Sequence, residues 1–273
     1  MSTPPQDNQN HPLYQQARDV HNLPPENAPR KRPPRPPEDR PYLSYILMAI
    51  NLVIYLAGFL SQDIGQQLFV QGSLFPPSVV EGNQFYRLFT AMFLHASPMH
   101  IFFNMYGLYI VGNMIEPIFG RLRFGIIYFL GGLGGSVLSL ALGDYGVPSI
   151  GASGAIFAIF TAEAVHLYQH RNVYKNVQGQ LRQILFLIGF NILIGFTPGS
   201  RIDNWGHIGG LIGGAILAWR IAPRLQRPTM PIKSMHDLST LDTNPISKHL
   251  PDLVIYVFGL IGILVVTLQF LAP

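Results

Sequence analysis

The sequence has 273 residues, of which 48% are hydrophobic and only 12% are charged. Soluble globular domains carry roughly 25% charged residues, so this composition excludes an ordinary soluble domain and indicates a membrane protein. The sequence contains no cysteine, which excludes disulfides and thiolate metal sites. In a membrane protein, the basic residues behind a formal net charge of +4 first indicate how the spans are oriented.

Residues 1–40 are rich in Pro, Asn, Gln and Arg and contain almost no apolar clusters. Such a segment cannot bury enough surface to fold, so we predict a disordered cytoplasmic tail over residues 1–40. Its basic run from Arg30 to Pro37 is interpreted as a charge cluster that sets topology. Binding of anionic lipid head groups or of a proline-reading partner are the alternatives. No cleavable signal peptide is evident, and the first apolar stretch is interpreted as a signal anchor.

Seven apolar stretches of membrane-spanning length follow the tail. They lie near residues 43–60, 99–119, 124–142, 150–168, 181–197, 204–221 and 253–271. This pattern predicts an all-α polytopic membrane protein in which a six-helix core is followed by one additional C-terminal transmembrane helix. The predicted parts after the tail are the core, a loosely ordered cytoplasmic linker and the seventh helix, over residues 41–222, 223–252 and 253–273. The aromatic-rich segment between the first two spans is expected to lie partly in the head-group interface.

The basic residues predict how the spans are oriented. Of the eighteen Lys and Arg residues, all but Arg87 and Arg201 fall in loops or at helix ends on one side of the predicted membrane. Because Lys and Arg gather in cytoplasmic loops, the N-terminus is predicted to be cytoplasmic and the C-terminus outside. Topology rather than nucleic-acid binding then explains the positive charge. The short chain and lean loops favour a bacterial plasma membrane, and the oligomeric state is left open.

Three of the spans begin with polar residues that can carry chemistry. The fourth span opens with the turn Gly151-Ala152-Ser153-Gly154. The glycines of this turn let another helix or a substrate backbone come close to the serine hydroxyl.

The second and sixth spans begin with histidines. His100 and Asn104 stand four residues apart, and so on one face, of the second span. His207 opens the sixth span beside Gly206 and Gly210. The four-residue spacing of these glycines gives a flat stripe that allows near backbone contact with another helix.

Because the spans alternate in direction, the second, fourth and sixth all begin on the outer side, and their polar residues converge at one depth. Serine is a weak nucleophile unless a base takes its proton, and His207 is the natural base for Ser153 because imidazole titrates near neutrality. Attack on a carbonyl creates an oxyanion. The predicted donors to it are the Ser153 N–H and the side chains of His100 and Asn104. Asp203 is interpreted as a helix cap, with orientation of His207 as the alternative.

The other intramembrane polar residues are assigned structural roles. Glu116, near the cytoplasmic end of the second span, is expected to tie the helix end to a loop or to an arginine. Glu163 and His166 are expected to reach the interface or to pair with each other. For His100, a structural hydrogen bond between helices is the alternative to a functional role.

The sequence resembles the rhomboid family of intramembrane serine proteases. The resemblance covers six spans, about residues 42–222, and includes Glu116 in its expected place. The motifs that carry it are His95-x4-His100-x3-Asn104, Gly151-x-Ser153-Gly154 and His207-x2-Gly210-x3-Gly214. The resemblance implies that Ser153 is the nucleophile and that His207 is its general base. It also implies that His100 and Asn104 donate hydrogen bonds in the oxyanion hole. No metal or cofactor is implied.

The sequence departs from the family pattern at two places. Phe157 stands where many members have a tyrosine that stacks on the catalytic histidine, so the ring is kept and the hydroxyl is lost. Tyr86 and Arg87 replace a Trp-Arg pair of the first outside loop, which puts the packing of that loop in doubt. The seventh span resembles the form of the family that has one helix added after the core.

The resemblance implies an endopeptidase that cleaves single-span membrane proteins within the lipid bilayer, at segments with small or helix-destabilising residues. One alternative is a non-catalytic member that binds membrane helices, although such members usually lack the serine or the histidine, and this chain has both. The other alternative is a channel that uses His100, His207 and Glu116 as a proton path. A channel would need polar residues that continue across the membrane, and few are present.

Overall fold

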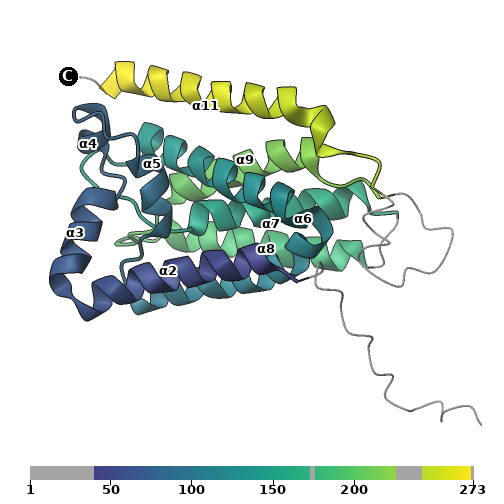
Figure 1. Cartoon of the computed structure of the whole chain (residues 1–273), viewed down its shortest axis with the longest axis horizontal. Helices are drawn as coiled ribbons and strands as arrows, with labels where there is room; N and C mark the ends of the chain where they lie inside the picture. Colours follow the sequence, from purple (N-terminus) through teal and green to yellow (C-terminus); the bar gives the residue numbers. More distant parts are fainter. Residues whose placement is uncertain (1–39, 173–175, 226–241, 272–273) are drawn as a thin grey trace, which may run out of the picture. The chain divides into compact units, whose positions relative to one another are not determined.

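The computed structural model describes residues 40–172, 176–225 and 242–271. All but the last residue of the predicted tail, and residues 226–241 of the predicted linker, lie outside this part of the chain. The described part is built from helices (Figure 1). Its α-helices are α2 Tyr42–Leu60, α3 Gln62–Gly72, α4 Pro76–Val80, α5 Arg87–Thr90, α6 Pro98–Leu142, α7 Ser153–Gln169, α8 Val177–Gly195, α9 Asn204–Ile221 and α11 Leu250–Leu271. Short 3₁₀ turns lie at Ala91–Phe93 and Ile246–His249.

Every predicted span falls on a helix. By length and composition, four helical segments of the described part are apolar enough to cross a membrane, namely Tyr42–Leu60, Pro98–Leu142, Val177–Gly195 and Ile246–Leu271. The helices α7 and α9 pack mainly against other helices of the bundle, and much of their surface is buried. The prediction of an all-α polytopic membrane protein is therefore confirmed.

The second and third predicted spans follow each other in α6, which is divided at Gly120. This glycine has φ 74° and ψ 158°, which is not a helical conformation. His100, near the start of α6, and Gly135, near its end, both border the turn before α7. An ideal Cβ on Gly151 would meet His100, and one on Gly154 would meet the Cα of Gly135. The two halves of α6 therefore run antiparallel, as two separate spans do.

The centre of the bundle consists of α6, α7 and α9, which make the most extensive helix contacts in the described chain. Small residues explain how closely α7 and α9 approach. A Cβ at position 210 would overlap the carbonyl oxygen of Gly154, and one at position 154 would lie 3.2 Å from the carbonyl oxygen of Gly206. Without a hydrophobic drive between helices in lipid, this close packing supplies the attraction.

Glu116 joins α6 to the start of α2. Its carboxylate accepts hydrogen bonds from the backbone N–H groups of Leu43 and Ser44, at 2.8 and 2.7 Å, and from the Ser44 hydroxyl at 2.6 Å. The first N–H groups of a helix have no partner within the helix, so a buried acid supplies one from outside. The sequence-based expectation of a structural tie at Glu116 agrees with this position, but the partner is a helix N-terminus rather than a loop or an arginine.

Glu163 and His166 lie on α7 away from the turn that carries Ser153, and both are buried. Their burial agrees with the structural role predicted for both residues, but not with side chains that reach the interface. His166 contacts the rings of Phe119 and His170, at centroid distances of 5.4 and 4.2 Å. These residues belong to the packing at the opposite end of the core.

The chain after α9 is tied back to the core by polar contacts. Asp242 forms an ion pair with Arg123 at 2.6 Å and accepts the backbone N–H of Arg224. Asn244 donates to the carbonyl oxygens of Arg220 and Ala222. The described ends of the predicted linker therefore pack beside the break at Gly120 in α6 and on the last residues of α9.

The last helix, α11, runs along the edge of the bundle (Figure 1). Its Tyr256 hydroxyl donates to the carbonyl oxygen of Leu130 at 3.1 Å. The same hydroxyl fills the space in front of Gly134 and Gly213, where it would contact a Cβ on either residue. Most of the remaining surface of α11 is apolar and exposed, which suits contact with lipid.

Candidate active site

Ser153 and His207 meet at the adjoining starts of two helices. Ser153 is the first residue of α7, and His207 lies in the first turn of α9. The Ser153 Oγ and the His207 Nε2 lie 2.9 Å apart, which is hydrogen-bond distance. When the imidazole carries its proton on Nδ1, the serine hydroxyl donates to Nε2, and this is the arrangement in which histidine can act as a base.

The imidazole of His207 is held by an aromatic ring one turn along α7. Phe157 stacks on it with a centroid distance of 4.3 Å and an interplanar angle of 21°. Both side chains are buried. The stacking that the sequence resemblance implied for this position is thus present with phenylalanine in place of tyrosine, and it fixes the plane of the imidazole.

The turn before Ser153 is fastened to the outside segment between α2 and α6. Ser149 and Leu74 exchange two backbone hydrogen bonds, of 2.9 and 3.0 Å, and the N–H of Gly151 donates to the carbonyl oxygen of Ala91 at 2.9 Å. These bonds set the backbone path that leads into α7.

Gly151 is needed for two separate reasons. Its φ of +130° is a conformation that residues with a side chain rarely adopt. A Cβ there would also lie 2.7 Å from the Nε2 of His100, which is too close. The missing side chain therefore lets the His100 ring come beside the turn that presents Ser153.

His100 and Asn104 lie at the start of α6, on the side that faces this turn. The His100 N–H is capped by the Ser97 hydroxyl at 3.2 Å. Asn104 is buried, and its amide donates to the carbonyl oxygen of His100 at 2.9 Å. One N–H of the Asn104 amide is therefore engaged, and the second has no acceptor among the residues that the structure describes.

His95 packs its ring against the edge of the His100 ring, with a centroid distance of 5.0 Å. Both of its ring nitrogens are buried and have no hydrogen-bond partner among the described residues. The structure thus puts His95 against His100, which itself borders the turn before Ser153.

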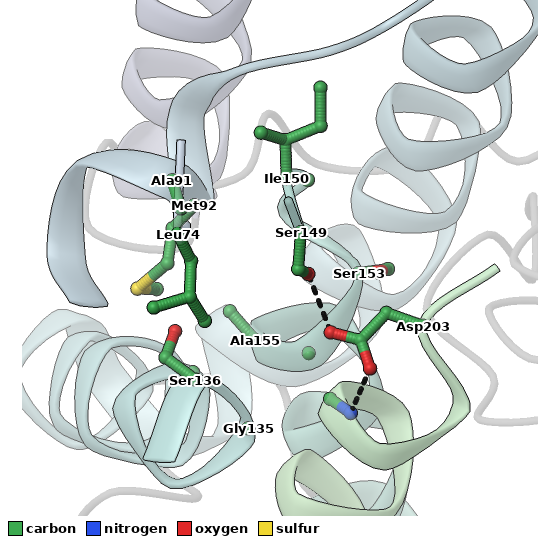
Figure 2. Close-up of a pocket in the computed structure, with 14 residues that line it drawn as sticks. Leu74, Ala91, Met92, Gly135, Ser136, Ser149, Ile150, Ser153, Ala155 and Asp203 are labelled. Atoms are coloured by element: carbon green, nitrogen blue, oxygen red, sulfur yellow. Dashed lines mark hydrogen bonds between the residues drawn. The ribbon is translucent and has the colours of Figure 1, made fainter. Parts of the chain in front are cut away.

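Asp203 caps α9, as the sequence predicted. One carboxylate oxygen accepts the N–H of Gly206 at 2.8 Å. The other accepts the hydroxyl of Ser149 at 2.5 Å (Figure 2). The Nδ1 of His207 is buried without a partner in the described part of the chain, so no third residue orients the imidazole by a hydrogen bond there.

Ser149 is the residue of this site that the sequence did not reveal. It lies 54 residues from Asp203 along the chain, and no local pattern links a loop serine to a distant helix cap. The only feature of the sequence that points to Ser149 is its position four residues before Ser153.

A small cavity of about 30 Å³ lies beside Ser153. Its lining includes Ser136, Ser149, Ser153 and Asp203, as Figure 2 shows. This volume is enough for about one water molecule, and the four polar side chains are suitable partners for one. Among the described residues no cluster of three His, Cys, Asp or Glu side chains could hold a metal ion.

The predicted site residues fall into two sets. The first is gathered around the turn before α7 and consists of His100, Asn104, Gly151, Ser153, Gly154, Phe157, Gly206, His207 and Gly210, with His95 behind it. Glu116 is separate from it, because this residue lies at the junction of α6 with the start of α2.

Comparison with known proteins relates this arrangement to one family. Residues 82–224, more than half of the chain, match the family model described as Rhomboid domain. RHOMBOID-like protein 6, mitochondrial, of Arabidopsis thaliana is 40% identical over 148 residues, which are 54% of this chain and 47% of that protein. Rhomboid protease GluP of Bacillus subtilis (strain 168) is 33% identical over 180 residues, 66% of this chain and 34% of that protein.

A relative without activity is also similar. Inactive RHOMBOID-like protein 8 of A. thaliana is 36% identical over 141 residues, 52% of this chain and 39% of that protein. The chain spans less than half the length of each of these three relatives. The match over residues 82–224 includes every helix that borders the Ser153 and His207 pair, and the chain belongs to the rhomboid family.

Proposed function

We propose that this protein is an intramembrane serine endopeptidase in which Ser153 is the nucleophile and His207 the general base. The observation that carries the proposal is the 2.9 Å contact between the Ser153 Oγ and the His207 Nε2. A serine at the start of a helix, next to an oriented imidazole, has the two features that acyl transfer requires.

In the first half of the reaction, the Ser153 Oγ attacks the carbonyl carbon of a peptide bond while His207 Nε2 takes the hydroxyl proton. The tetrahedral intermediate collapses when His207 gives that proton to the leaving amine, so that the peptide bond breaks and an acyl-enzyme remains. In the second half, His207 takes a proton from water, and the resulting hydroxide attacks the ester. Collapse releases the acid and returns the proton to Ser153.

The oxyanion is proposed to be stabilised by three donors. The Ser153 N–H has no partner within α7 because it begins that helix, and the helix dipole adds to its effect. The His100 ring and the free N–H of the Asn104 amide supply the others. Each such donor typically contributes about 3 kcal/mol to lowering the barrier.

The proposed catalytic unit is a dyad. Stacking of Phe157 takes over the orientation of His207 that an acid provides in a triad. Asp203 is engaged by Gly206 and Ser149 instead.

The proposed substrates are single-span membrane proteins whose segments contain small or helix-destabilising residues, because a peptide bond locked in a helix is closed to attack. The proposed location is a bacterial plasma membrane, with the N-terminus cytoplasmic, the C-terminus outside, and the site near the outer surface. Gathering of basic residues on the side opposite Arg87 and Arg201 supports this orientation.

The second candidate function is non-catalytic binding of membrane helices, which the similarity to a relative named as inactive favours. The test reconstitutes the full chain in liposomes with a single-span reporter whose membrane segment contains Gly and Ala near one end. We expect cleavage by the wild type and by Ser78→Ala, a serine substitution outside the site. Ser153→Ala and His207→Ala should each abolish it. Capture of the reporter without cleavage by the folded wild type would instead support the binding function.

A further inference from the structure

The carboxylate of Asp203 joins the two segments that carry the proposed nucleophile and base. Asp203 stands four residues before His207, and Ser149 stands four residues before Ser153. One oxygen of Asp203 caps the first turn of α9 through the N–H of Gly206, and the other binds the Ser149 hydroxyl (Figure 2). A single side chain therefore connects the start of α9 with the turn that leads into α7.

Apart from the contacts of His207 with Ser153 and Phe157, whose geometry is to be explained, these segments meet by packing. Gly154 lies against the carbonyl oxygen of Gly206 in a packing contact, which sets how closely the helices approach but allows them to slide or rotate. The backbone bonds of Ser149 and Gly151 lead instead to Leu74 and Ala91 in the outside segment. The bond from Ser149 to Asp203 is thus a directional link between the turn and α9.

We propose that Asp203 is a positioning residue, which holds Ser153 in hydrogen-bond reach of His207 by binding Ser149. The inference rests on the proposed dyad and names a residue that acts on it from outside the reacting atoms. A bond between a hydroxyl and a carboxylate is short and charge-assisted, and so is stronger than a neutral one. The distance between Ser153 and His207 must be held closely, because a misplacement of about 1 Å between reacting groups can lower the rate roughly 100-fold.

The first test measures labelling by a fluorophosphonate probe over a range of probe concentrations, which separates the maximal rate from the half-saturating concentration. Ser149→Ala and Asp203→Ala should each lower the maximal rate about tenfold or more and change the half-saturating concentration less than twofold. Asp203→Asn and Ser149→Thr, which can still form the link, should recover to within about threefold of wild type. Asp144→Asn removes an exposed acid from the same loop and serves as the control.

A double variant separates positioning from local structural damage. If both residues act through one link, Ser149→Ala added to Asp203→Ala should lower the maximal rate no further. A loss in the double variant equal to the product of the two single losses would overturn the proposal. Wild-type labelling rates in both single variants would also overturn it, and would leave the Ser153 and His207 dyad untouched.

A second test needs no catalytic activity. Amide hydrogen exchange of the Ser153→Ala protein is compared with and without Asp203→Ala. Exchange in the turn at residues 147–152 should accelerate when Asp203 is replaced, although the two lie far apart in sequence, and should stay unchanged with Asp144→Asn. Unchanged exchange in the Asp203 variant would contradict the link. Failure of the wild type to label would instead count against the proposed function, and the exchange result would still decide the link.

Discussion

Replacing Gly210 by alanine tests whether close packing of α7 and α9 holds the dyad together. A Cβ at this position would lie 2.8 Å from the carbonyl carbon of Gly154 and 3.1 Å from its Cα, and closer still to its carbonyl oxygen. Carbon atoms pack at about 3.5 Å or more, so the carbon contact alone requires the helices to separate by roughly 0.7 Å, and the oxygen contact requires more. The Ser153 Oγ and the His207 Nε2 now lie 2.9 Å apart. If the same shift lengthens this distance, the two atoms are no longer within hydrogen-bond range.

We therefore expect Gly210→Ala to lower the rate of fluorophosphonate labelling about 10- to 100-fold. Overpacking should also lower the free energy of unfolding by about 1–3 kcal/mol. Gly262→Ala in α11 is the matched control, because a Cβ there meets no atom within 4 Å. Labelling of a folded Gly210→Ala protein within threefold of the wild-type rate would refute the reasoning.

Three further predictions concern residues around the core. Glu116→Gln should lower the free energy of unfolding by about 2–3 kcal/mol, since it leaves a backbone donor at the start of α2 without an acceptor; thermal unfolding in detergent measures it. Phe157→Ala should lower the labelling rate about tenfold by freeing the imidazole, and Phe157→Tyr should keep most of it. Asp242→Asn should destabilise the protein by about 1–3 kcal/mol at neutral pH through loss of the bond to Arg123.

The pH dependence of the last effect has a definite sign. Burial alone would raise the pKa of Asp242, but the N–H groups of Asn244 and Arg224 and the Arg123 guanidinium outweigh it, and the pKa is lowered. In the unfolded chain the pKa of an aspartate is about 4. The stabilisation is therefore complete above this pH and is lost as the pH falls through the lower pKa that Asp242 has in the folded protein. The difference in stability between the wild type and Asp242→Asn should narrow in acid. A constant difference, or one that grows in acid, would contradict the assignment.

Outcomes that would contradict the other two predictions are equally specific. If Glu116→Gln unfolds at the wild-type temperature, the carboxylate does not fasten the start of α2. If Phe157→Ala labels as fast as the wild type, then stacking is not what orients the imidazole.

The features that the sequence predicted are those encoded locally. Each span was visible as an apolar stretch of sufficient length, and the meeting of Ser153 with His207 was expected because both lie in the first turns of helices predicted to begin on the same side. The close approach of α7 and α9 followed from the spacing of Gly206 and Gly210, because glycines four residues apart share a helix face.

The features that the sequence did not predict depend on pairs of distant residues. The acceptor at Glu116 was expected to bind a loop or an arginine, but it binds backbone donors 72 and 73 residues away. Backbone N–H groups leave no trace in a sequence pattern, so this partner could not be inferred. The link from Ser149 to Asp203 is hidden for a similar reason, since serine is common in loops and its partner is set by the packing of two helices.

The most direct test of the proposed chemistry is to map the fluorophosphonate adduct by mass spectrometry in the wild type, Ser153→Ala and His207→Ala. We predict one adduct, on Ser153 of the wild type, and none in either variant, because the serine is activated only by the imidazole 2.9 Å from its hydroxyl. An adduct on another residue, or wild-type labelling of Ser153 in the His207→Ala protein, would contradict the dyad.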